Sequence, residues 1–508
     1  MALSPDREAF RTLARQGNLV PVWEELLADE QTPVGAYARL RDRLRADHGV
    51  SHTFLLESVE GGEQIGRYSF IGGQPRAIFR AWDRRVEIER RGRTETLEDT
   101  DPLDALRRLL GDYRPVRNPP LPRFTGGAVG FMGYECVARF EPVPVREDQA
   151  IPAPDMVFLV TDTLVVFDRV RHTVLLIANA LVADGDADAA YDRARTRIAA
   201  LRETLSAPRP ARMIALGGPQ PLPSTPHSTM TRAQFVDAVE RAREYIRAGD
   251  VIQVVLSQRF DVPFAGDALD VYRALRSVNP SPYMFCLDLG GSALVGSSPE
   301  VHVRCEDRAV AVRPIAGTRP RADDPARDAA LERELLADPK ERAEHLMLVD
   351  LARNDIGRVC EYGSVTVPEF MVIERYSHVM HIVSEVTGRL REDLDVFDLM
   401  RATFPAGTVS GAPKIRAMQL IAELETARRG PYSGVVGYFG FDGGLDCCIT
   451  IRTAVLDQGR ALVQAGAGIV ADSDPDREYE ETCSKARGLL AAIERARHVV
   501  RSNEEAGT

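Results

Sequence analysis

Short apolar runs with alternating polar residues recur along the chain, and they limit its fold more than any other feature. In the first two hundred residues they include "RAIFRAW", "RRVEIER", "DMVFLVTDTLVVFD" and "HTVLLIANALV", joined by turns rich in glycine and aspartate. A period of two is the pattern of a strand with one buried face. Because helices do not follow the strands one by one, the sequence predicts an α+β fold with large, mainly antiparallel sheets flanked by helices.

The later part of the chain continues this pattern with longer elements. Strands are predicted in "VIQVVLSQRF", "PYMFCLDLGGSALVGSS", "HVMHIVSEVTG" and the segment 434–468, with hairpin turns at Asp442-Gly443 and Gln458-Gly459. Three amphipathic helices are predicted at about 325–357, 412–427 and 475–499, each with a proline near its start.

One segment, "SAPRPARMIALGGPQPLPSTPHSTM" at 206–230, interrupts the periodic apolar residues with Pro, Gly and Ser. A chain of 508 residues has room for more than one domain. We therefore expect an N-terminal domain at 1–205, a linker at 206–230 and a C-terminal domain at 231–499.

Composition excludes several classes of protein. The net charge is -11, from 64 basic and 75 acidic residues without a basic block, so nucleic acid is not expected as a partner. No apolar run has the length of a membrane span and the first residues lack a signal peptide, so we expect a soluble, cytoplasmic protein. The seven cysteines are an odd number scattered through apolar strands, which favours reduced thiols over disulfides.

Two of the predicted helices carry a Glu-x-x-Glu pair in their first two turns. Glu341 and Glu344 lie on one face of the first helix, and Glu478 and Glu481 lie on one face of the other. An apolar stripe follows each pair, so we expect the carboxylates to continue a buried face. Four carboxylates suit a hard cation such as Mg²⁺, which prefers oxygen ligands.

Two alternatives apply to these pairs. The same spacing is common on solvated faces, and it also occurs at Glu57/Glu60, Glu60/Glu63 and Glu95/Glu98. The run Glu341-x-x-Glu344-His345 is one residue away from the zinc-peptidase motif H-x-x-E-H, but it lacks the first histidine, so a zinc site is rejected. We expect His345 to pack in the core or to support a neighbouring ligand.

Seven motifs occur in the order found in chorismate-utilising enzymes. They are "SSPE" at 297–300, "RPIAGTRPR" at 313–321, "ERAEHLMLVDLARND" at 341–355, "YSHVMHIVSEVTG" at 376–388, "GTVSGAPKIRAMQLI" at 407–421, "CITIRTA" at 448–454 and "QAGAGIVADSDPDREYEET" at 464–482. The chain resembles anthranilate synthase component I, closely over 231–495 and more loosely before. The resemblance implies conversion of chorismate and ammonia to anthranilate and pyruvate, the first committed step of tryptophan biosynthesis. It also implies a chorismate site between the sheets.

The resemblance assigns roles to individual residues. Glu344 and Glu481 would ligate Mg²⁺, which holds the ring carboxylate of chorismate, while Glu341 and Glu478 would hold its waters. The enolpyruvyl carboxylate would bind to Tyr432, Arg452, the backbone of Gly466, Ala467 and Gly468, and Lys485. Residues Gly317, Thr318 and Thr408 would orient the ring.

Proton transfer is assigned in the same way. Glu300 would be the general acid for the departing C4 hydroxyl group, and His381 would assist proton transfer or pyruvate elimination. Packing in the core is the alternative for His381, which shares a strand face with Val379 and Val383. A binding protein that has kept the fold and lost the chemistry is the alternative for the whole chain. We expect such a protein to have lost part of this residue set, which is complete here.

Two missing lysines select the nucleophile within the family. Relatives that add water carry a lysine base where this chain has Gln253, and aminodeoxychorismate synthases carry a lysine nucleophile where it has Ala316. Ammonia is then the expected nucleophile. Aminodeoxychorismate synthase component I and isochorismate or salicylate synthase are the alternatives. No cysteine lies in a Gly-flanked elbow, so glutamine would require a separate amidotransferase, anthranilate synthase component II, and free ammonium is the other source.

A regulatory site is implied by a looser match. In anthranilate synthases an L-L-E-S serine and a P-Y-M segment form a feedback site for L-tryptophan, and this chain has Ser58 in "TFLLESVE" and Pro282-Tyr283-Met284. The site would belong to the N-terminal domain and would make inhibition by tryptophan allosteric. A strand end with a capped turn is the structural alternative for "TFLLESVE".

Overall fold

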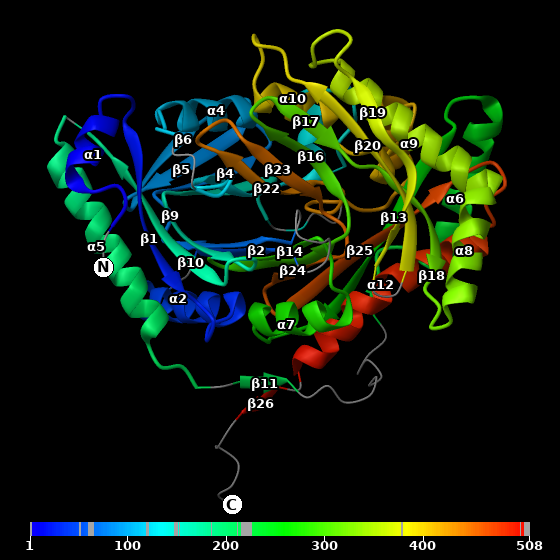
Figure 1. The fold of residues 1–508 in the computed structure, drawn as a ribbon. Helices are drawn as coiled ribbons and strands as arrows, with labels where there is room; N and C mark the ends of the chain where they lie inside the picture. The colour runs from blue at the N-terminus through cyan, green and yellow to red at the C-terminus, as the bar shows by residue number, and fades with distance from the viewer. Residues whose placement is uncertain are drawn as a thin grey trace, which may run out of the picture.

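A computed structural model describes residues 3–49, 52–58, 66–117, 121–146, 151, 153–183, 185–210, 212–214, 226–376, 379–497 and 499–501. Glu60, Glu63 and most of the segment 211–225 lie outside these ranges. Two large sheets pack against each other and helices cover their outer faces (Figure 1). Every pairing between the named strands is antiparallel in the described part of the chain, so the predicted α+β fold is confirmed.

The first sheet combines strands from the early and the late parts of the chain. Its order is β1 (Leu19–Leu27), β10 (Thr173–Leu181), β9 (Thr163–Asp168), β3 (Tyr68–Gly73), β2 (His52–Glu57), β14 (Tyr283–Leu289), β15 (Ser292–Ser298), β24 (Thr453–Asp457), β25 (Arg460–Ile469), β13 (Gln253–Pro263) and β12 (His227–Ser228), with β21 (Gly411–Ala412) beside β13.

The second sheet is equally mixed. Its order is β18 (Ile315–Pro320), β20 (Val379–Arg389), β17 (Ala309–Val312), β16 (Val301–Glu306), β23 (Leu445–Ile449), β22 (Val435–Gly440), β7 (Gly127–Met132), β8 (Met156–Thr161), β4 (Ala77–Trp82), β5 (Arg85–Arg90) and β6 (Arg93–Leu97), with β19 (Thr366–Arg375) beside β20. A small separate sheet pairs β11 (Arg212–Ile214) with β26 (Val499–Arg501).

The sheets cross the boundary expected at 206–230. Strand β2 pairs with β14, and β7 pairs with β22, so segments from both sides of the boundary are joined by main-chain hydrogen bonds in each sheet. The boundary therefore divides the sequence but not the sheets, and the division into two domains stays a prediction.

All three predicted helical segments are helical in the structure, and one of them needs a correction. The helix expected at 325–357 is two helices, α8 (Pro325–Ala337) and α9 (Pro339–Gly357). Asp338 ends the first and caps the second, accepting hydrogen bonds from the backbone of Lys340 and Glu341, and Pro339 has no N–H to continue the first. The other two are α11 (Lys414–Leu424) and α12 (Pro475–Arg497).

The sequence prediction does not name several other helices. Two of them, α6 (Arg232–Ala248) and α10 (Val396–Thr403), begin with capping boxes at Thr231 and Asp395, which are readable signals. The remaining elements are α1 (Arg7–Leu13), α2 (Pro33–His48), α4 (Pro102–Gly111), α5 (Ala187–Ser206), α7 (Ala268–Val278), η1 (Tyr134–Arg139) and η2 (Gly407–Val409).

Apolar side chains fill three main layers. Phe70, Phe131, Phe285 and Tyr438 belong to a cluster between the two sheets, which draws on strands from both. A second cluster lies under α1, α2, α5, α7 and α12 on the first sheet, and a third lies mainly under α4, α9, α10 and α11. Each sheet therefore buries both faces, which explains why many of its strands are apolar throughout.

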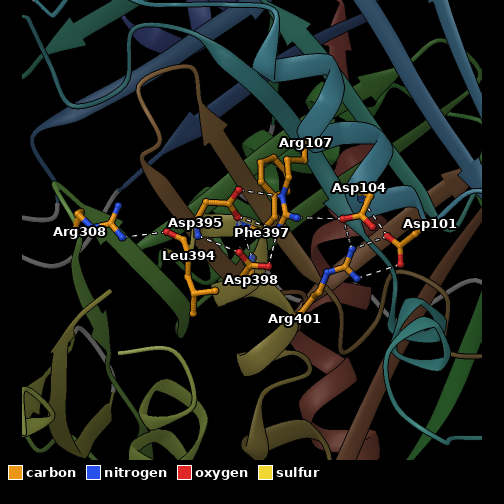
Figure 2. Close-up of polar contacts among 9 residues, drawn as sticks. All are labelled: Asp101, Asp104, Arg107, Arg308, Leu394, Asp395, Phe397, Asp398 and Arg401. Atoms are coloured by element: carbon orange, nitrogen blue, oxygen red, sulfur yellow. Dashed lines mark hydrogen bonds and ion pairs between the residues drawn. The ribbon is translucent and has the colours of Figure 1, made fainter. Parts of the chain in front are cut away.

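Helix α4 is fixed to α10 by an ion-pair cluster (Figure 2). The guanidinium of Arg401 contacts Asp101 at 2.8 Å and Asp104 at 2.9 Å, and that of Arg107 contacts Asp395 at 3.0 Å and Asp398 at 2.6 Å. Asp101 and Asp395 also cap the two helices. The cluster joins the early part of the chain to the helix that leads into residues 403–408.

The cysteines behave as expected. All seven are free thiols, and six of them are buried. No helix among the described residues has the length and apolar character needed to cross a membrane.

Candidate active site

Glu300 lies in the short connection between β15 and β16 and is almost fully buried. The hydroxyl of Thr408, in η2, donates a hydrogen bond of 2.7 Å to its carboxylate. Burial outweighs this bond and raises the pKa of Glu300 to about 7. A carboxyl group with such a pKa is partly protonated at neutral pH, as a proton donor must be.

His381 meets the bulged edge of β18. Its Nδ1 atom lies 3.0 Å from the carbonyl oxygen of Gly317 and 3.1 Å from the hydroxyl of Thr318. Gly317 has a φ of +73°, a conformation that glycine adopts readily, and the register of β18 on β20 shifts at this point. Burial lowers the pKa of His381, which favours the neutral ring.

Glu341 connects this bulge to α9. A Cβ atom added at Gly317 would lie 3.1 Å from its carboxylate, so the glycine lets Glu341 approach the backbone closely. Arg319 binds the same carboxylate at 3.1 Å. Glu341 is thus held by a cation of the neighbouring strand.

The other carboxylates of the two pairs repel one another. Burial raises the pKa of Glu344, and the negative charges of Glu341 and Glu481 raise it further. Burial also raises the pKa of Glu478, as does Glu481. Helices α9 and α12 therefore bring their glutamates within electrostatic range of each other. The expected buried face is wrong for Glu481, whose side chain is 48% exposed.

These residues fit a divalent cation in donor type. The set offers only carboxylate oxygens, and its mutual repulsion would be relieved by a bound positive charge. No group of three or more His, Cys, Asp or Glu side chains with metal-binding geometry is found in the described ranges. The sequence-based ligand pair, Glu344 and Glu481, has two members, so the other positions on the ion would belong to water and substrate.

Lys485 links α12 to β25. Its ammonium group donates to the carbonyl oxygen of Gly466 at 3.0 Å and contacts Glu481 at 2.6 Å. A Cβ atom at Gly466 would lie 2.7 Å from the hydroxyl of Tyr432, so only glycine at this position leaves room for that hydroxyl beside β25. Burial raises the pKa of Tyr432 to about 12, which keeps its hydroxyl protonated.

Arg452 connects the separate groups. Its positive charge acts on His381, and it interacts electrostatically with both Tyr432 and Glu481. Its φ is +51°, in a region that residues other than glycine rarely adopt. Residues from β20, α12 and the loop before β22 thus lie within electrostatic range of one arginine.

The two positions predicted to distinguish the family's members lie in the same region. Gln253 is buried at the start of β13, where a Cβ atom at Gly468 would lie 2.7 Å from its side-chain nitrogen. Ala316 is buried beside Gly317 in β18. Neither position carries an amine.

Sequence reasoning missed a buried ion pair behind Tyr432. Arg429 is inaccessible to solvent, contacts Glu425 at 2.5 Å, and donates to the carbonyl oxygens of Val409 and Val255. Its guanidinium lies 5.6 Å from the centre of the Tyr432 ring. The i, i+4 spacing of Glu425 and Arg429 was the only available signal. His345, by contrast, is buried as expected and hydrogen-bonds Ser384 at 2.7 Å.

The residues expected to bind tryptophan all line a single cavity, and Glu300 is not part of its lining. Ser58, Pro282, Tyr283 and Met284 share it with Asp446 and others, and its volume is about 50 Å³. The hydroxyl of Tyr283 donates to Asp446 at 2.8 Å. Since a volume of this size holds one or two water molecules, an amino acid would require neighbouring side chains to move.

Comparisons with known proteins agree with one another. Residues 51–491 match the family of chorismate binding enzymes. The anthranilate synthase component 1 of Synechocystis sp. is 48% identical, over 97% of this chain and 99% of that protein. The protein of the same name from Aquifex aeolicus is 46% identical, over 97% and 98% of the two chains.

Solved structures give the same result. Anthranilate synthase component I from Streptococcus pneumoniae matches with a TM-score of 0.75 and 37% identity, over 92% of this chain and 99% of that one. The menaquinone-specific isochorismate synthase from Escherichia coli shares the fold, with a TM-score of 0.68 and 21% identity over 96% and 98% of the two chains. The chain belongs to the family of chorismate binding enzymes and, within it, to the anthranilate synthase component I group.

Proposed function

We propose that this chain adds ammonia to C2 of chorismate as the C4 hydroxyl group leaves, and then eliminates pyruvate to give anthranilate. The observation that carries the proposal is the buried, partly protonated Glu300, held by Thr408 in a site without a lysine at Gln253 or Ala316. The proposal is supported by relatives named anthranilate synthase component 1, which match this chain over almost their whole length.

Each of the chain's own groups has a defined task. The protonated carboxyl of Glu300 gives its proton to the departing hydroxyl oxygen, which leaves as water. The neutral ring of His381, held by Gly317 and Thr318, assists proton transfer when pyruvate is eliminated. Arg452, the hydroxyl of Tyr432 and the β25 backbone at 466–468 bind the enolpyruvyl carboxylate through fixed donors.

Glu344 and Glu481 would hold Mg²⁺, with Glu341 and Glu478 orienting its waters. When bound there, the ion supplies a positive charge for the ring carboxylate of chorismate. Lys485 lies against Glu481 in this structure, so it would move toward the substrate carboxylate once Glu481 binds the ion.

Ammonia would come from a separate amidotransferase, anthranilate synthase component II, or from free ammonium. A glutaminase needs a reactive thiolate, and burial raises the pKa of the six buried cysteines of this chain. None of the six is suited to that chemistry. The reaction would stand at the first committed step of tryptophan biosynthesis, in the cytoplasm.

L-Tryptophan would inhibit by binding the cavity lined by Ser58, Tyr283 and Met284. The structure of the neighbouring strands supports a coupling to the active site. Strand β14 pairs with β15, where Ser297 donates to the carbonyl of Arg452 at 3.1 Å and Ser298 donates to that of Ile449 at 2.7 Å. Because tryptophan requires this cavity to expand, its binding would displace β14 and with it the backbone beside Arg452 and Glu300.

The proposal is tested by mixing the pure chain with chorismate, ammonium and Mg²⁺ and following the fluorescence of anthranilate. Fluorescence should rise, stop when EDTA is added, and resume when Mg²⁺ is restored in excess. A chain that produces no anthranilate with ammonium would overturn the proposal, and full activity in metal-free buffer would remove Mg²⁺ from it.

A further inference from the structure

A small cavity lies directly behind Glu300. Its volume is about 30 Å³, and its polar lining consists of Glu300, His302, Asp355, Thr403 and Thr408. The rest of the lining is apolar or backbone, from α9, β16, β17, β23, Pro314 and the segment 406–407. A space of this size with several polar partners is what a single ordered water molecule requires.

The hydrogen bonds around His302 favour one tautomer of its ring. Its Nε2 atom lies 3.0 Å from the hydroxyl of Thr403, and that hydroxyl donates its hydrogen to the carbonyl of Leu399 at 3.0 Å. With its hydrogen used in this way, the hydroxyl accepts from the ring, which then donates from Nε2. Burial, aided by the positive charge of Lys414, lowers the pKa of His302 to about 3, so the ring is neutral and its Nδ1 is an acceptor.

That acceptor has no donor among the described residues. His302 is 3% exposed, and its Nδ1 atom is buried without a hydrogen-bond partner there. The two hydroxyl groups that line the cavity already use their hydrogens, Thr403 on Leu399 and Thr408 on Glu300. Buried acceptors of this kind are normally satisfied by protein or by ordered water.

We propose that one water molecule occupies this cavity, donates a hydrogen bond to Nδ1 of His302 and, before chorismate binds, accepts one from the protonated carboxyl of Glu300. The carboxyl releases this bond when its proton goes to the leaving hydroxyl group. His302 is then a positioning residue for the general acid. A hydrogen bond donated by the neutral carboxyl stabilises its protonated form, which is the form that gives the proton to the leaving hydroxyl. The inference deepens the proposed function and rests on the role given there to Glu300.

The other charged groups near the cavity do not donate a hydrogen bond to Nδ1 of His302 in place of this water. The carboxylate of Asp355, on α9, is paired with Lys414, on α11, at 2.7 Å. Lys414 also donates to the carbonyl of Thr403 at 3.0 Å. Among the described residues, Glu300, His302 and Asp355 are the titratable groups that line the cavity.

Two matched substitutions separate the proposed role from a purely structural one. Asn at 302 places a hydrogen-bonding atom near the position of Nδ1 and gives up the contact with Thr403. Gln at 302 keeps an atom near the position of Nε2, which contacts Thr403, and gives up the atom that faces the water. If His302 only supports Thr403, the His302→Gln variant should keep its activity. If His302 positions Glu300 through the water, the His302→Asn variant should keep it instead.

The measurement is kcat/KM for chorismate as a function of pH at constant free ammonia. Without the acceptor at 302 the pKa of Glu300 falls, so the loss of activity at alkaline pH begins earlier. A fall of one pKa unit lowers kcat/KM of His302→Gln at pH 8 by about tenfold relative to wild type. His302→Asn should stay within about twofold, and thermal melting checks that both variants fold. Equal losses in the two variants, or no loss in His302→Gln, would overturn the inference.

A second readout does not depend on activity. A high-resolution crystal structure of the wild-type chain should show a water peak within hydrogen-bond distance of Nδ1 of His302, and an empty cavity would overturn the inference. If the wild-type chain makes no anthranilate, the proposed function fails. In that case the crystal structure alone decides whether the water is present.

Discussion

Burial sets the pKa of Glu300. The side chain is 5% exposed, accepts one side-chain hydrogen bond from Thr408 and has a pKa raised to about 7. A surface glutamate would be ionised at neutral pH and could not donate a proton. The same residue type at Glu341 is paired with the guanidinium of Arg319 at 3.1 Å. Two glutamates of one site thus differ because of their surroundings.

Replacing Glu300 by Gln should lower kcat by about 10²- to 10⁴-fold, because the amide cannot supply the proton. The pH profile gives an independent check. Glu300 acts when protonated, so the wild-type rate should fall as the pH rises through about 7, at constant free ammonia. A Gln variant of near wild-type rate, or a wild-type rate that is flat from about pH 6 to 9, would contradict the assignment.

At the scale of elements, α9 and α12 create the acidic site by presenting equivalent turns. Pro339 and Pro475 each begin a helix, and Glu344 and Glu481 follow about one and a half turns later. The sequence predicts these starts because Asp-Pro is a local signal. It does not show that the helices approach each other, because that depends on packing against β25 and β20.

Glu344→Ala and Glu481→Ala should each raise the Mg²⁺ concentration needed for half-maximal activity by roughly tenfold or more. Glu95→Ala is the matched control, since Glu95 lies on the exposed strand β6 and forms a pair of the same spacing with Glu98, which follows the strand. Isothermal titration with Mg²⁺ alone measures the effect without turnover. Equal Mg²⁺ affinity in all three variants would remove the metal from α9 and α12.

The α4–α10 ion pairs are expected to contribute to stability. Arg401→Met leaves Asp101 and Asp104 without their partner on α10, so the free energy of unfolding should fall by about 1 kcal/mol. Arg353→Met, which breaks an exposed pair with Asp350, should change it by less than about 0.5 kcal/mol. Urea unfolding at low salt and at 1 M NaCl, about a 3 Å screening length, should show the difference shrinking with salt. Equal stabilities of the two variants would show that the cluster has no such role.

Local signals explain what the sequence could predict. The turn at Gln458-Gly459 has φ values of +44° and +77°, as a two-residue hairpin requires, and the Asp474-Pro475 start of α12 is found where expected. Contacts between distant segments were not predictable. Arg429 meets Tyr134 and Val255, and His302 meets Thr403, only because strands and helices far apart in sequence pack together.

For the whole molecule, the joined sheets determine how regulation would work. The cavity with Ser58 lies where β2 of the early segment pairs with β14 of the later one, so one ligand there contacts both. Glu57 beside it is held by Arg169, Tyr272 and Arg276, which ties the same point to the surrounding elements. Expansion of the cavity would therefore be felt in both segments.

L-Tryptophan should inhibit the ammonium-dependent reaction, and Ser58→Phe should relieve the inhibition because its ring fills the space near β14. Turnover of chorismate without tryptophan should change by less than about threefold, since Ser58 contributes nothing to the catalytic residues. Calorimetry with tryptophan provides the binding measurement. Unchanged rates and no heat of binding at saturating tryptophan would contradict the regulatory site and would leave Ser58 with only a structural role at the end of a strand.

The most direct test of the account is the identity of the product. The pure chain is incubated with chorismate, ammonium and Mg²⁺, and the mixture is analysed by mass spectrometry together with an enzymatic assay for pyruvate. Because neither Gln253 nor Ala316 provides an amine, we predict anthranilate and pyruvate in equal amounts. Accumulation of 4-amino-4-deoxychorismate or isochorismate as the main product would contradict the central claim.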